Sequence, residues 1–464
     1  MLTNVFFTQS VIMSVQDPEN RDMAWLRQWM QQHAITEVEC LLPDFTGNAR
    51  GKILPASKFL KEGGMRLPDN IFLQTVNGDW PDDEHIDWTE RDMELHADIN
   101  TPRLVPWASE PTAQVIHDCF DADGNPVEMA PRSVLRRVLQ LYEREGWRPV
   151  VAPELEFFLV KKNEDWDYPL EPPIGRNGRP ETARQSFSID AVNEFDPIFE
   201  EMYDFCEAQD LEVDTLIHES GAAQMEVNFI HGDALDLADQ VFLFKRTMRE
   251  AAMRHNVYAT FMAKPMKNEP GSAMHIHQSL VDASGNNLFA NPDGSHSELF
   301  LHFIGGMQRY IPAAVALFAP NVNSYRRLAF GDSAPRNMAW GEDNRTVGLR
   351  VPRSGLADRR IENRFAGADA NPYLALAASL ACGYLGMKQR IAPTEEVVGN
   401  AYDMPFGLAR NLEEALQELE QCEELRDILG SRFVQAFIAV KRKEYEAFFT
   451  VISAWEREFL LLNV

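Results

Sequence analysis

The sequence predicts an α+β fold in two parts, and three features of its 464 residues favour it. Several short stretches alternate apolar and polar residues, as strands with one buried face do. Other stretches carry apolar residues every three or four positions, as amphipathic helices do. A small unit of short elements comes before residue 130, whereas residues 371–462 are mostly of the helical type. An apolar content of 45% supplies the core that such a chain needs.

The first part, residues 1–129, is expected to be a small α+β unit. Its expected elements are a helix at 23–32, a strand at 37–42, a loop at 43–48, extended structure at 51–55 and a strand at 115–120. A turn follows at Asp123-Gly124-Asn125-Pro126, whose residue types favour tight turns. We therefore place the domain boundary near residue 130.

The second part, residues 130–464, begins with a clear helix start. Pro131 suits the first helical position, apolar residues follow at helical spacing as far as Tyr142, and Gly146 ends the pattern. A polar loop rich in Pro and Gly spans residues 161–185 and is long enough to form a flap. Further helices are expected at 196–209, at 233–255 and over most of 371–462.

Four expected strands in this part have acids, histidines or arginines on one face and apolar residues on the other. Successive side chains of a strand point to opposite faces, so residues two apart share a face. The polar faces comprise Glu154 and Glu156; Gln224, Glu226 and Asn228; His275, His277 and Ser279; and Arg360, Glu362 and Arg364. Solvent-facing strands favour Lys, Thr and Ser, and these faces contain no Lys. We interpret the four strands as walls of one cavity.

Charge and cysteine content limit the classes of function. The net charge of −27 argues against nucleic-acid binding and would attract cationic ligands, although an acidic surface that only aids solubility explains it equally well. The sequence has no apolar stretch long enough for a transmembrane helix, and Met1–Val15 lacks the basic start of a secretory signal. Five scattered cysteines without metal-ligand spacing suit free thiols in a reducing cytoplasm.

The side chains of the expected cavity suit divalent cations and anionic substrates. Four or five carboxylates with one or two imidazoles can bind Mg²⁺ or Mn²⁺, in the number that a two-metal site needs. Nine arginines between Arg326 and Arg364 can hold carboxylates or phosphates, although surface ion pairing is expected to explain about half of them. The sequence has no Gly-x-x-x-x-Gly-Lys-Ser/Thr loop, which excludes a P-loop nucleotide site.

These stretches together resemble the glutamine synthetase superfamily over almost the whole chain. The matching motifs are Pro153-Glu154-Leu155-Glu156-Phe157-Phe158, His218-Glu219, Gln224-Met225-Glu226, Gly271-Ser272-Ala273-Met274-His275-Ile276-His277, Asn323-Ser324-Tyr325-Arg326-Arg327-Leu328 and Arg359-Arg360-Ile361-Glu362-Asn363-Arg364. The resemblance implies an N-terminal β-grasp domain and a catalytic domain with a curved antiparallel sheet and helices. It also implies a homo-dodecamer of two hexameric rings, with each active site between neighbouring subunits.

The resemblance implies a role for each matching residue. The implied ligands of the metal ion that orders the amino-acid substrate are Glu156, Glu219 and Glu226, and those of the nucleotide-side metal ion are Glu154, His275 and Glu362. The positions that match the ATP site are His277, Ser279, Arg350 and Arg360. The positions that match the site for glutamate or its phosphorylated carboxylate are Gly271, Arg327, Arg345 and Arg364. The implied catalytic residues are Arg345 and Asp44, which a neighbouring subunit contributes to help deprotonate the incoming nitrogen.

The implied reaction joins glutamate to a nitrogen nucleophile at the expense of ATP, with two or more Mg²⁺ or Mn²⁺ ions in each active site. ATP phosphorylates the side-chain carboxylate of glutamate, and the nitrogen then displaces phosphate. Activation is needed because a carboxylate oxygen leaves poorly and phosphate leaves well. Metal ions and arginines stabilise negative charge at both steps.

Two positions depart from the members of the family that use ammonium. Ser333 stands where they have a glutamate that helps bind ammonium, and Pro270 stands where they have an asparagine that touches glutamate. Loss of the carboxylate leaves room for a larger amine. Both changes resemble the γ-glutamylpolyamine synthetase branch, which ligates glutamate to putrescine, spermidine or related amines in polyamine catabolism. Trp80 with Asp82-Asp83-Glu84 could form a rim for such an amine, although a solvated acidic loop is the more ordinary interpretation.

Three alternatives stay open at this point. The chain could be a glutamine synthetase that uses ammonium, a γ-glutamyl ligase for a monoamine such as ethanolamine, or a non-catalytic structural relative. Ser333 argues against the first, and the filled metal and arginine positions argue against the last. Tyr402 resembles a tyrosine that some bacterial members have adenylylated, but we expect no such modification here.

Overall fold

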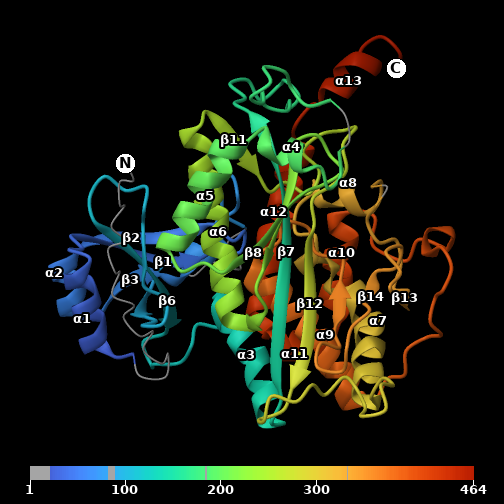
Figure 1. Cartoon of the computed structure of the whole chain (residues 1–464), viewed down its shortest axis with the longest axis horizontal. Helices are drawn as coiled ribbons and strands as arrows, with labels where there is room; N and C mark the ends of the chain where they lie inside the picture. Colours follow the sequence, from blue (N-terminus) through green and yellow to red (C-terminus); the bar gives the residue numbers. More distant parts are fainter. Residues whose placement is uncertain (1–20, 82–88, 183–184, 332) are drawn as a thin grey trace, which may run out of the picture.

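The computed structural model describes residues 21–81, 89–182, 185–331 and 333–464. Met1–Val15 and the acidic residues 82–84 of the proposed rim lie outside these ranges. The chain forms two sheets that differ in size and are covered by helices. In Figure 1 the N-terminal sheet (blue) lies at the left, while β7 and β12 run side by side through the centre of the molecule. The mixed α+β architecture that the sequence predicts is confirmed.

The N-terminal sheet has the strand order β2-β1-β6-β4-β3, and β5 also pairs with β6. Its strands are β1 (Glu37–Pro43), β2 (Ala49–Pro55), β3 (Gly64–Pro68), β4 (Asp92–Ala97), β5 (Arg103–Leu104) and β6 (Thr112–Phe120). The accompanying helices are α1 (Met23–Gln32), α2 (Ala56–Glu62) and the 3₁₀ turn η2 (Asp69–Leu73). Strand β1 pairs parallel with β6 and antiparallel with β2, so the β1–β2 turn emerges at one edge of the sheet.

Within the described residues, the second sheet has nine strands in the order β13-β14-β15-β12-β7-β9-β8, with β10 and β11 paired to β7. Its strands are β7 (Arg148–Lys161), β8 (Val213–His218), β9 (Gln224–Phe229), β10 (Gly232–Asp233), β11 (Val257–Thr260), β12 (Met274–Val281), β13 (Trp340–Glu342), β14 (Leu349–Val351) and β15 (Ile361–Asn363). All its pairings are antiparallel except that between β13 and β14. The expected strand at 360–365 is therefore shorter than its alternation suggests, because Arg360 and Arg364 lie outside β15.

The helices predicted for this part are present, and the structure adds α4, α7 and α8, which the sequence analysis did not predict. They are α3 (Pro131–Arg144), α4 (Ile189–Asn193), α5 (Asp196–Ala208), α6 (Ala234–Arg254), α7 (Glu298–Phe318), α8 (Ser324–Leu328), α9 (Pro372–Gln389), α10 (Leu412–Gln421), α11 (Glu423–Leu429), α12 (Ser431–Phe449), α13 (Ala454–Phe459) and the 3₁₀ turn η4 (Ala401–Asp403). Pro131 begins α3, and Gly146 follows its end with a φ of 73°. Asp233 caps α6 by accepting from two backbone N–H groups.

The core is a continuous set of apolar side chains under both sheets and between the helices. The helices α7 and α9 form its thickest part. Gly306 of α7 lies against Gly386 of α9, and a Cβ atom on either glycine would overlap the other backbone. Among the described residues, no helix is long and apolar enough to cross a membrane.

A buried ion cluster joins the N-terminal sheet to helices of the second part. We call it the Arg132 cluster: Arg132 of α3 with Asp98, Asp118, Asp239 and Tyr373. Arg132 donates to Asp98 at 2.8 Å, to Asp118 at 2.6 Å and to Asp239 at 2.7 Å. The first two carboxylates belong to the N-terminal sheet region and the third to α6, so one guanidinium connects both parts of the chain.

Candidate active site

The polar residues of the four predicted strands lie on one face of the larger sheet. Directly opposite residues on paired strands share a face. His275 lies opposite Glu154, and Glu156 lies opposite Glu226. At the other edge of this group, Glu362 lies opposite His277. Strand register thus brings together short alternating motifs that are separated by as many as about 200 residues in the sequence.

A cavity of about 310 Å³ opens over this face. The predicted site residues that line it are Glu154, Glu156, Glu219, Glu226, Gly271, His275, Arg327, Ser333, Arg345, Arg350 and Arg364. The other lining residues are Phe187, Ile217, Ser220, Asn228, Ala273, Gly331 and Ala334. The cavity therefore combines acids, arginines and a small apolar portion.

Three groups of side chains could each hold a metal ion, because their ligand atoms lie within 4.8 Å of one another. The groups in the described residues are Glu156, Glu219 and Glu226; Glu154, Glu226 and His275; and Glu154, His277 and Glu362. Carboxylate oxygens with at most one imidazole fit a hard divalent cation such as Mg²⁺ or Mn²⁺. The donor set therefore fits the metal ions that the sequence implies.

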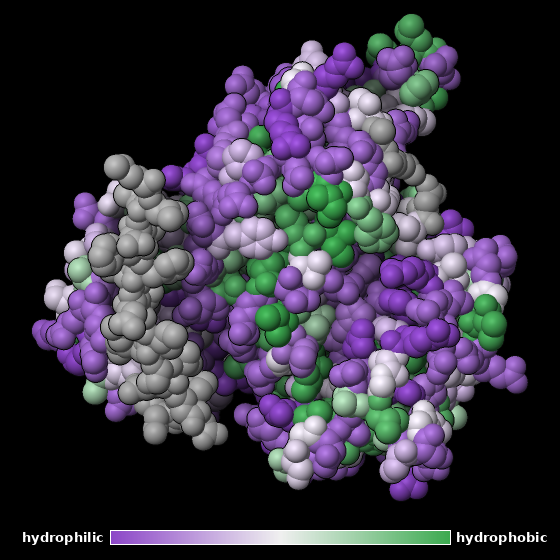
Figure 2. Space-filling model, viewed as in Figure 1, coloured by the Kyte–Doolittle hydropathy of each residue, from purple (hydrophilic) through white to green (hydrophobic). Residues whose placement is uncertain are grey.

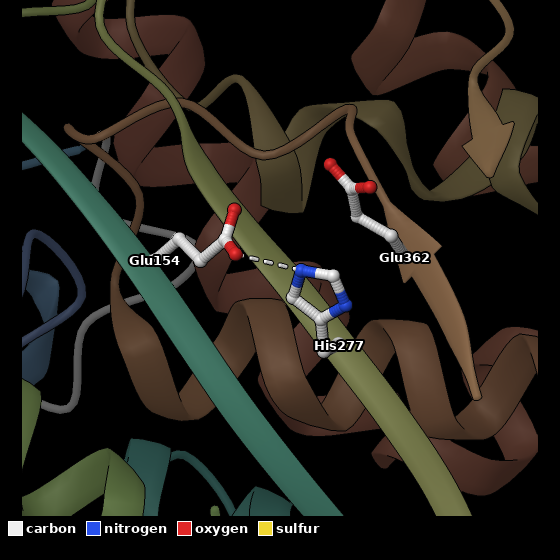
Figure 3. Close-up of side chains that lie close together, drawn as sticks. All are labelled: Glu154, His277 and Glu362. Carbon is white, nitrogen blue, oxygen red and sulfur yellow. Dashed lines mark hydrogen bonds and ion pairs between the residues drawn. The ribbon is translucent and has the colours of Figure 1, made fainter. Parts of the chain in front are cut away.

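The third group is shown in Figure 3, where Glu154 of β7, His277 of β12 and Glu362 of β15 point toward a common space. His277 Nε2 lies 2.9 Å from Glu154 Oε1. His275 Nδ1 lies 3.5 Å from Glu154 Oε2 and 3.6 Å from Glu362 Oε1. Both histidines thus contact Glu154, and His275 also contacts Glu362; the resemblance implies a metal ligand only at His275.

The acids of the site are of two kinds, because the pKa is raised in some and lowered in others. Burial raises the pKa of Glu226 to about 10, with further contributions from Glu154 and the other site carboxylates. Burial and the charge of Glu219 likewise raise the pKa of Glu156 to about 7. For Glu362, burial would raise the pKa, but positive charge nearby, that of Arg364 above all, outweighs it and lowers the pKa to about 2. The carboxyls of the Glu156–Glu219–Glu226 group are therefore costly to ionise together, and a bound divalent cation would favour their ionised forms.

The arginines surround the Glu362 side of the cavity. Arg350 and Arg364 contact Glu362 at 2.9 and 2.6 Å. Arg327 is buried and donates to the backbone oxygens of Arg364 and Phe365, both at 2.9 Å. Guanidinium groups fixed in this way are suited to binding carboxylate or phosphate oxygens.

Gly271 and Arg327 fit together closely. A Cβ atom on Gly271 would lie 2.7 Å from Arg327 Cγ and 2.7 Å from the Ala263 oxygen. Only glycine lets the backbone approach the arginine this closely. Both residues line the cavity, so the packing of one sets the position of the other.

Five predicted site residues are not among those that line the cavity of their own chain: Asp44, His277, Ser279, Arg360 and Glu362. His277 and Glu362 belong to the third group of possible metal ligands, and the other three have contacts elsewhere. Asp44 is buried after β1, where Oδ1 accepts from the backbone N–H groups of Thr46 and Asn48, and Oδ2 accepts from Arg50 at 2.8 Å. The Ser279 hydroxyl donates to the Arg359 oxygen at 2.9 Å. Arg360 donates to His277 Nδ1 at 3.2 Å, so it reaches the site indirectly. The roles of these three residues stay predictions.

Sequence reasoning missed the apolar residues of the cavity, notably Phe187 and Ile217. Phe187 lies just after the polar loop that we expected to form a flap, and Ile217 belongs to the edge strand β8. Neither residue type marks a functional site by itself. The one available signal was the proximity of Ile217 to Glu219, two residues further along.

Comparison with known proteins places this site in a family. The profile described as the glutamine synthetase catalytic domain matches residues 128–460. The chain belongs to the glutamine synthetase family. It is a ligase of that family, and the matched catalytic domain contains the residues that line the cavity.

Similar proteins span the whole chain. The γ-glutamylputrescine synthetase of Escherichia coli is 34% identical, with full coverage of both proteins. The glutamate–isopropylamine ligase of a Pseudomonas species is 32% identical and covers 93% of this chain and 96% of its own length. The glutamine synthetase of Pyrococcus abyssi is 35% identical over 90% of this chain and 92% of its own. Among solved structures, ligand-free GmaS superposes with a TM-score of 0.80 and 27% identity, covering 95% of this chain and 99% of that one.

Proposed function

We propose that this enzyme uses ATP to ligate the γ-carboxylate of glutamate to an amine, most favourably a polyamine such as putrescine or spermidine, in polyamine catabolism. The observation that carries the proposal is the cavity itself. Acids that suit divalent cations and arginines that suit phosphates line one space, and Ser333 lines it where ammonium-using relatives have a glutamate. The similarity to enzymes named for putrescine and isopropylamine supports an amine larger than ammonium.

In the proposed reaction, a γ-carboxylate oxygen of glutamate attacks the terminal phosphorus of ATP and ADP leaves. The amine nitrogen then attacks the acyl carbon of γ-glutamyl phosphate, phosphate leaves, and one proton is lost from the nitrogen. Bound Mg²⁺ or Mn²⁺ would neutralise phosphate charge during these steps. We assign one metal ion to the Glu156–Glu219–Glu226 group and another to Glu154, His275 and Glu362, with His277 beside the second.

The arginines would hold the anionic parts of the reactants. We assign Arg327, Arg345 and Arg364 with Gly271 to glutamate and its phosphorylated carboxylate, because all four line the cavity. The residues assigned to ATP are Arg350, His277, Ser279 and Arg360. Arg345 would stabilise the charge that develops on the transferred phosphoryl group, and preorganised charges of this kind usually provide the largest part of catalysis.

Asp44 would act in the active site of a neighbouring copy, where it helps remove the proton from the amine. Its loop lies outside the cavity of its own chain, and the side chain of Asn371 donates to the Asp44 backbone oxygen at 2.7 Å. This contact fixes the loop against the start of α9. A site completed by a neighbour requires self-association, so we propose the homo-dodecamer of two hexameric rings, with residues 1–129 as the N-terminal domain.

The C-terminal end of the chain is consistent with self-association. After α12 the side chains of Val451, Ile452, Trp455, Leu461 and Leu462 are all exposed. This segment projects at the upper right of Figure 1, and Figure 2 shows apolar surface gathered there. Exposed apolar segments of this kind are commonly covered by another subunit.

The testing experiment is phosphate release from ATP with Mg²⁺ and glutamate, with ammonium, putrescine, spermidine or ethanolamine as the nucleophile. Release driven by putrescine or spermidine and hardly by ammonium is expected. Release with ammonium alone would establish a glutamine synthetase instead. A preference for ethanolamine would keep the ligase chemistry and reassign the amine.

A further inference from the structure

We propose that Phe187 and Ile217 form an apolar wall that binds the carbon chain of the amine and so selects alkylamines over ammonium. The inference rests on the proposed function and adds the two residues that determine its specificity. Both side chains line the cavity together with the metal-binding acids. Neither belongs to a motif by which the family is recognised in this sequence.

The larger sheet changes its chemistry from one edge to the other. Arg350 lies on β14, and the site histidines with Glu154, Glu156, Glu226 and Glu362 lie on β15, β12, β7 and β9. Ile217 lies on the edge strand β8, and Glu219 directly follows that strand. Ile217 lies directly opposite Glu226, so it shares the face of the acids. Anionic phosphates are therefore expected near β14, whereas the β8 edge offers hydrocarbon contact.

Phe187 completes the apolar edge. Its side chain is 70% exposed although it lines the cavity, so the ring has room for a ligand on the open side. Its φ of 64° lies in the left-handed region, which is unfavourable for a bulky residue. Its backbone N–H donates to the His218 oxygen at 2.8 Å, and this bond helps to hold the unfavourable conformation.

The same turn fixes Phe187 relative to the metal-binding acids. Glu181 accepts from His218 Nε2 at 3.1 Å and from the backbone N–H of Ala223 at 2.8 Å. His218 and Ala223 stand on either side of Glu219, which belongs to the Glu156–Glu219–Glu226 group. Glu181 and Phe187 thus both contact the turn that carries Glu219, which places Phe187 beside the metal-binding acids.

The wall would recognise methylene groups rather than a second charge. Among the described residues that line the cavity, the acids are the four assigned to metal ions, so no further carboxylate lies beside Phe187 or Ile217 to pair with a distal ammonium. Burial of each methylene group increases the binding constant about fourfold. Butylamine and putrescine, which have the same chain, should therefore depend on the wall to a similar extent.

Phe187→Ala in the full-length enzyme tests the inference. We expect kcat/KM for butylamine and putrescine to fall about tenfold or more, while kcat/KM for hydroxylamine, which has no carbon, and KM for glutamate and ATP change less than about twofold. Phe187→Leu should retain most of the alkylamine activity, because it keeps an apolar contact. Phe330→Ala is the matched control, since Phe330 is similarly exposed but does not line the cavity.

The results separate this inference from the proposed function. If kcat/KM of Phe187→Ala falls equally for hydroxylamine and the alkylamines, or falls for neither, the apolar wall does not select the amine. The proposed alkylamine ligation would still stand. A wild-type enzyme that uses ammonium but no alkylamine would overturn the proposed function and the wall together. A selective loss in Phe187→Ala, absent from Phe330→Ala, would establish the wall.

Discussion

The molecule holds two clusters of buried charge that differ in how the charge is compensated. In the Arg132 cluster, one guanidinium contacts three carboxylates, and Tyr373 donates to Asp239 at 2.6 Å. In the Glu156–Glu219–Glu226 group, nearby arginines lower the pKa of Glu156 and Glu219, but burial outweighs them and the pKa of both carboxyls is raised. Both clusters are enclosed by the same kind of fold, so burial alone does not explain the difference.

The difference indicates which cluster serves stability and which serves chemistry. Buried charges that are paired and hydrogen-bonded cost little to maintain, and removing one partner costs much. Buried carboxylates without a cation repel one another and destabilise the protein until a metal ion binds. We therefore expect substitutions in the two clusters to change stability in opposite directions.

The largest effect is expected for Glu226→Gln, which should reduce ligation on the order of a thousandfold by removing a charged metal ligand. The same change should stabilise the metal-free protein at pH 8. Because the pKa of Glu226 is raised from 4.5 to about 10, the folded wild type loses stability as the pH rises through that interval, and the amide does not. Thermal unfolding with a chelator at pH 5 and pH 8 measures this. A variant less stable than wild type at pH 8 would contradict the comparison.

Arg132→Met is expected to have the opposite effect on stability. It leaves Asp98, Asp118 and Asp239 without their shared cation, which should lower the free energy of unfolding by about 3–5 kcal/mol. Denaturant unfolding gives the value. Arg136→Met is the control, because Arg136 contacts two of the same aspartates but is partly exposed, and it should cost about 1 kcal/mol or less. Equal losses in the two variants would show that burial of Arg132 adds nothing.

Gly271→Ala tests whether the arginines of the site depend on close packing. The added Cβ would displace Arg327, at a cost of about 1–3 kcal/mol, so KM for glutamate should rise about tenfold. Steady-state kinetics with varied glutamate measure this rise. Gly399→Ala is the control, since no atom lies within 4 Å of a Cβ at that position. An unchanged KM in Gly271→Ala would mean that Arg327 does not hold glutamate.

The smallest change in activity is expected for Ser333→Glu. This substitution adds another carboxylate to a cavity that is already lined by four acids. It should shift the ratio of kcat/KM values for putrescine and ammonium toward ammonium by about five- to tenfold, because a partly exposed ionic contact contributes about 1 kcal/mol. Ser333→Gln has the same size without the charge and separates the two effects. If both variants leave the ratio unchanged, another residue sets the amine preference.

Alternation of polar and apolar residues was enough to predict the strands and faces that carry the site acids. It indicated correctly that Glu154, Glu226 and His275 share one cavity, because register keeps residues of one face together. Alternation could not show where a strand ends. Arg360 fits the pattern of β15 but precedes this strand, and its side chain donates to His277 and to the Asp358 backbone oxygen.

The features that the sequence could not reveal depend on tertiary structure. Arg132 has the sequence context of an ordinary helix arginine, and only the packing of α3 against α6 and the N-terminal sheet buries it. Phe187 and Ile217 contribute by position rather than by reactive groups, so no motif marks them. Residues that act by shape need the fold before they can be found.

The strand order also constrains when the site can form during synthesis. Strand β12 pairs with β7, which lies more than a hundred positions earlier in the sequence, and with β15, which lies about eighty positions later. Pairing between such distant segments is expected to be slow. Strand β15, which carries Glu362, is the last of these three strands to leave the ribosome. A nascent chain that ends before β15 therefore lacks Glu362 and the group that it forms with Glu154 and His277, whereas the Glu156–Glu219–Glu226 group is already present.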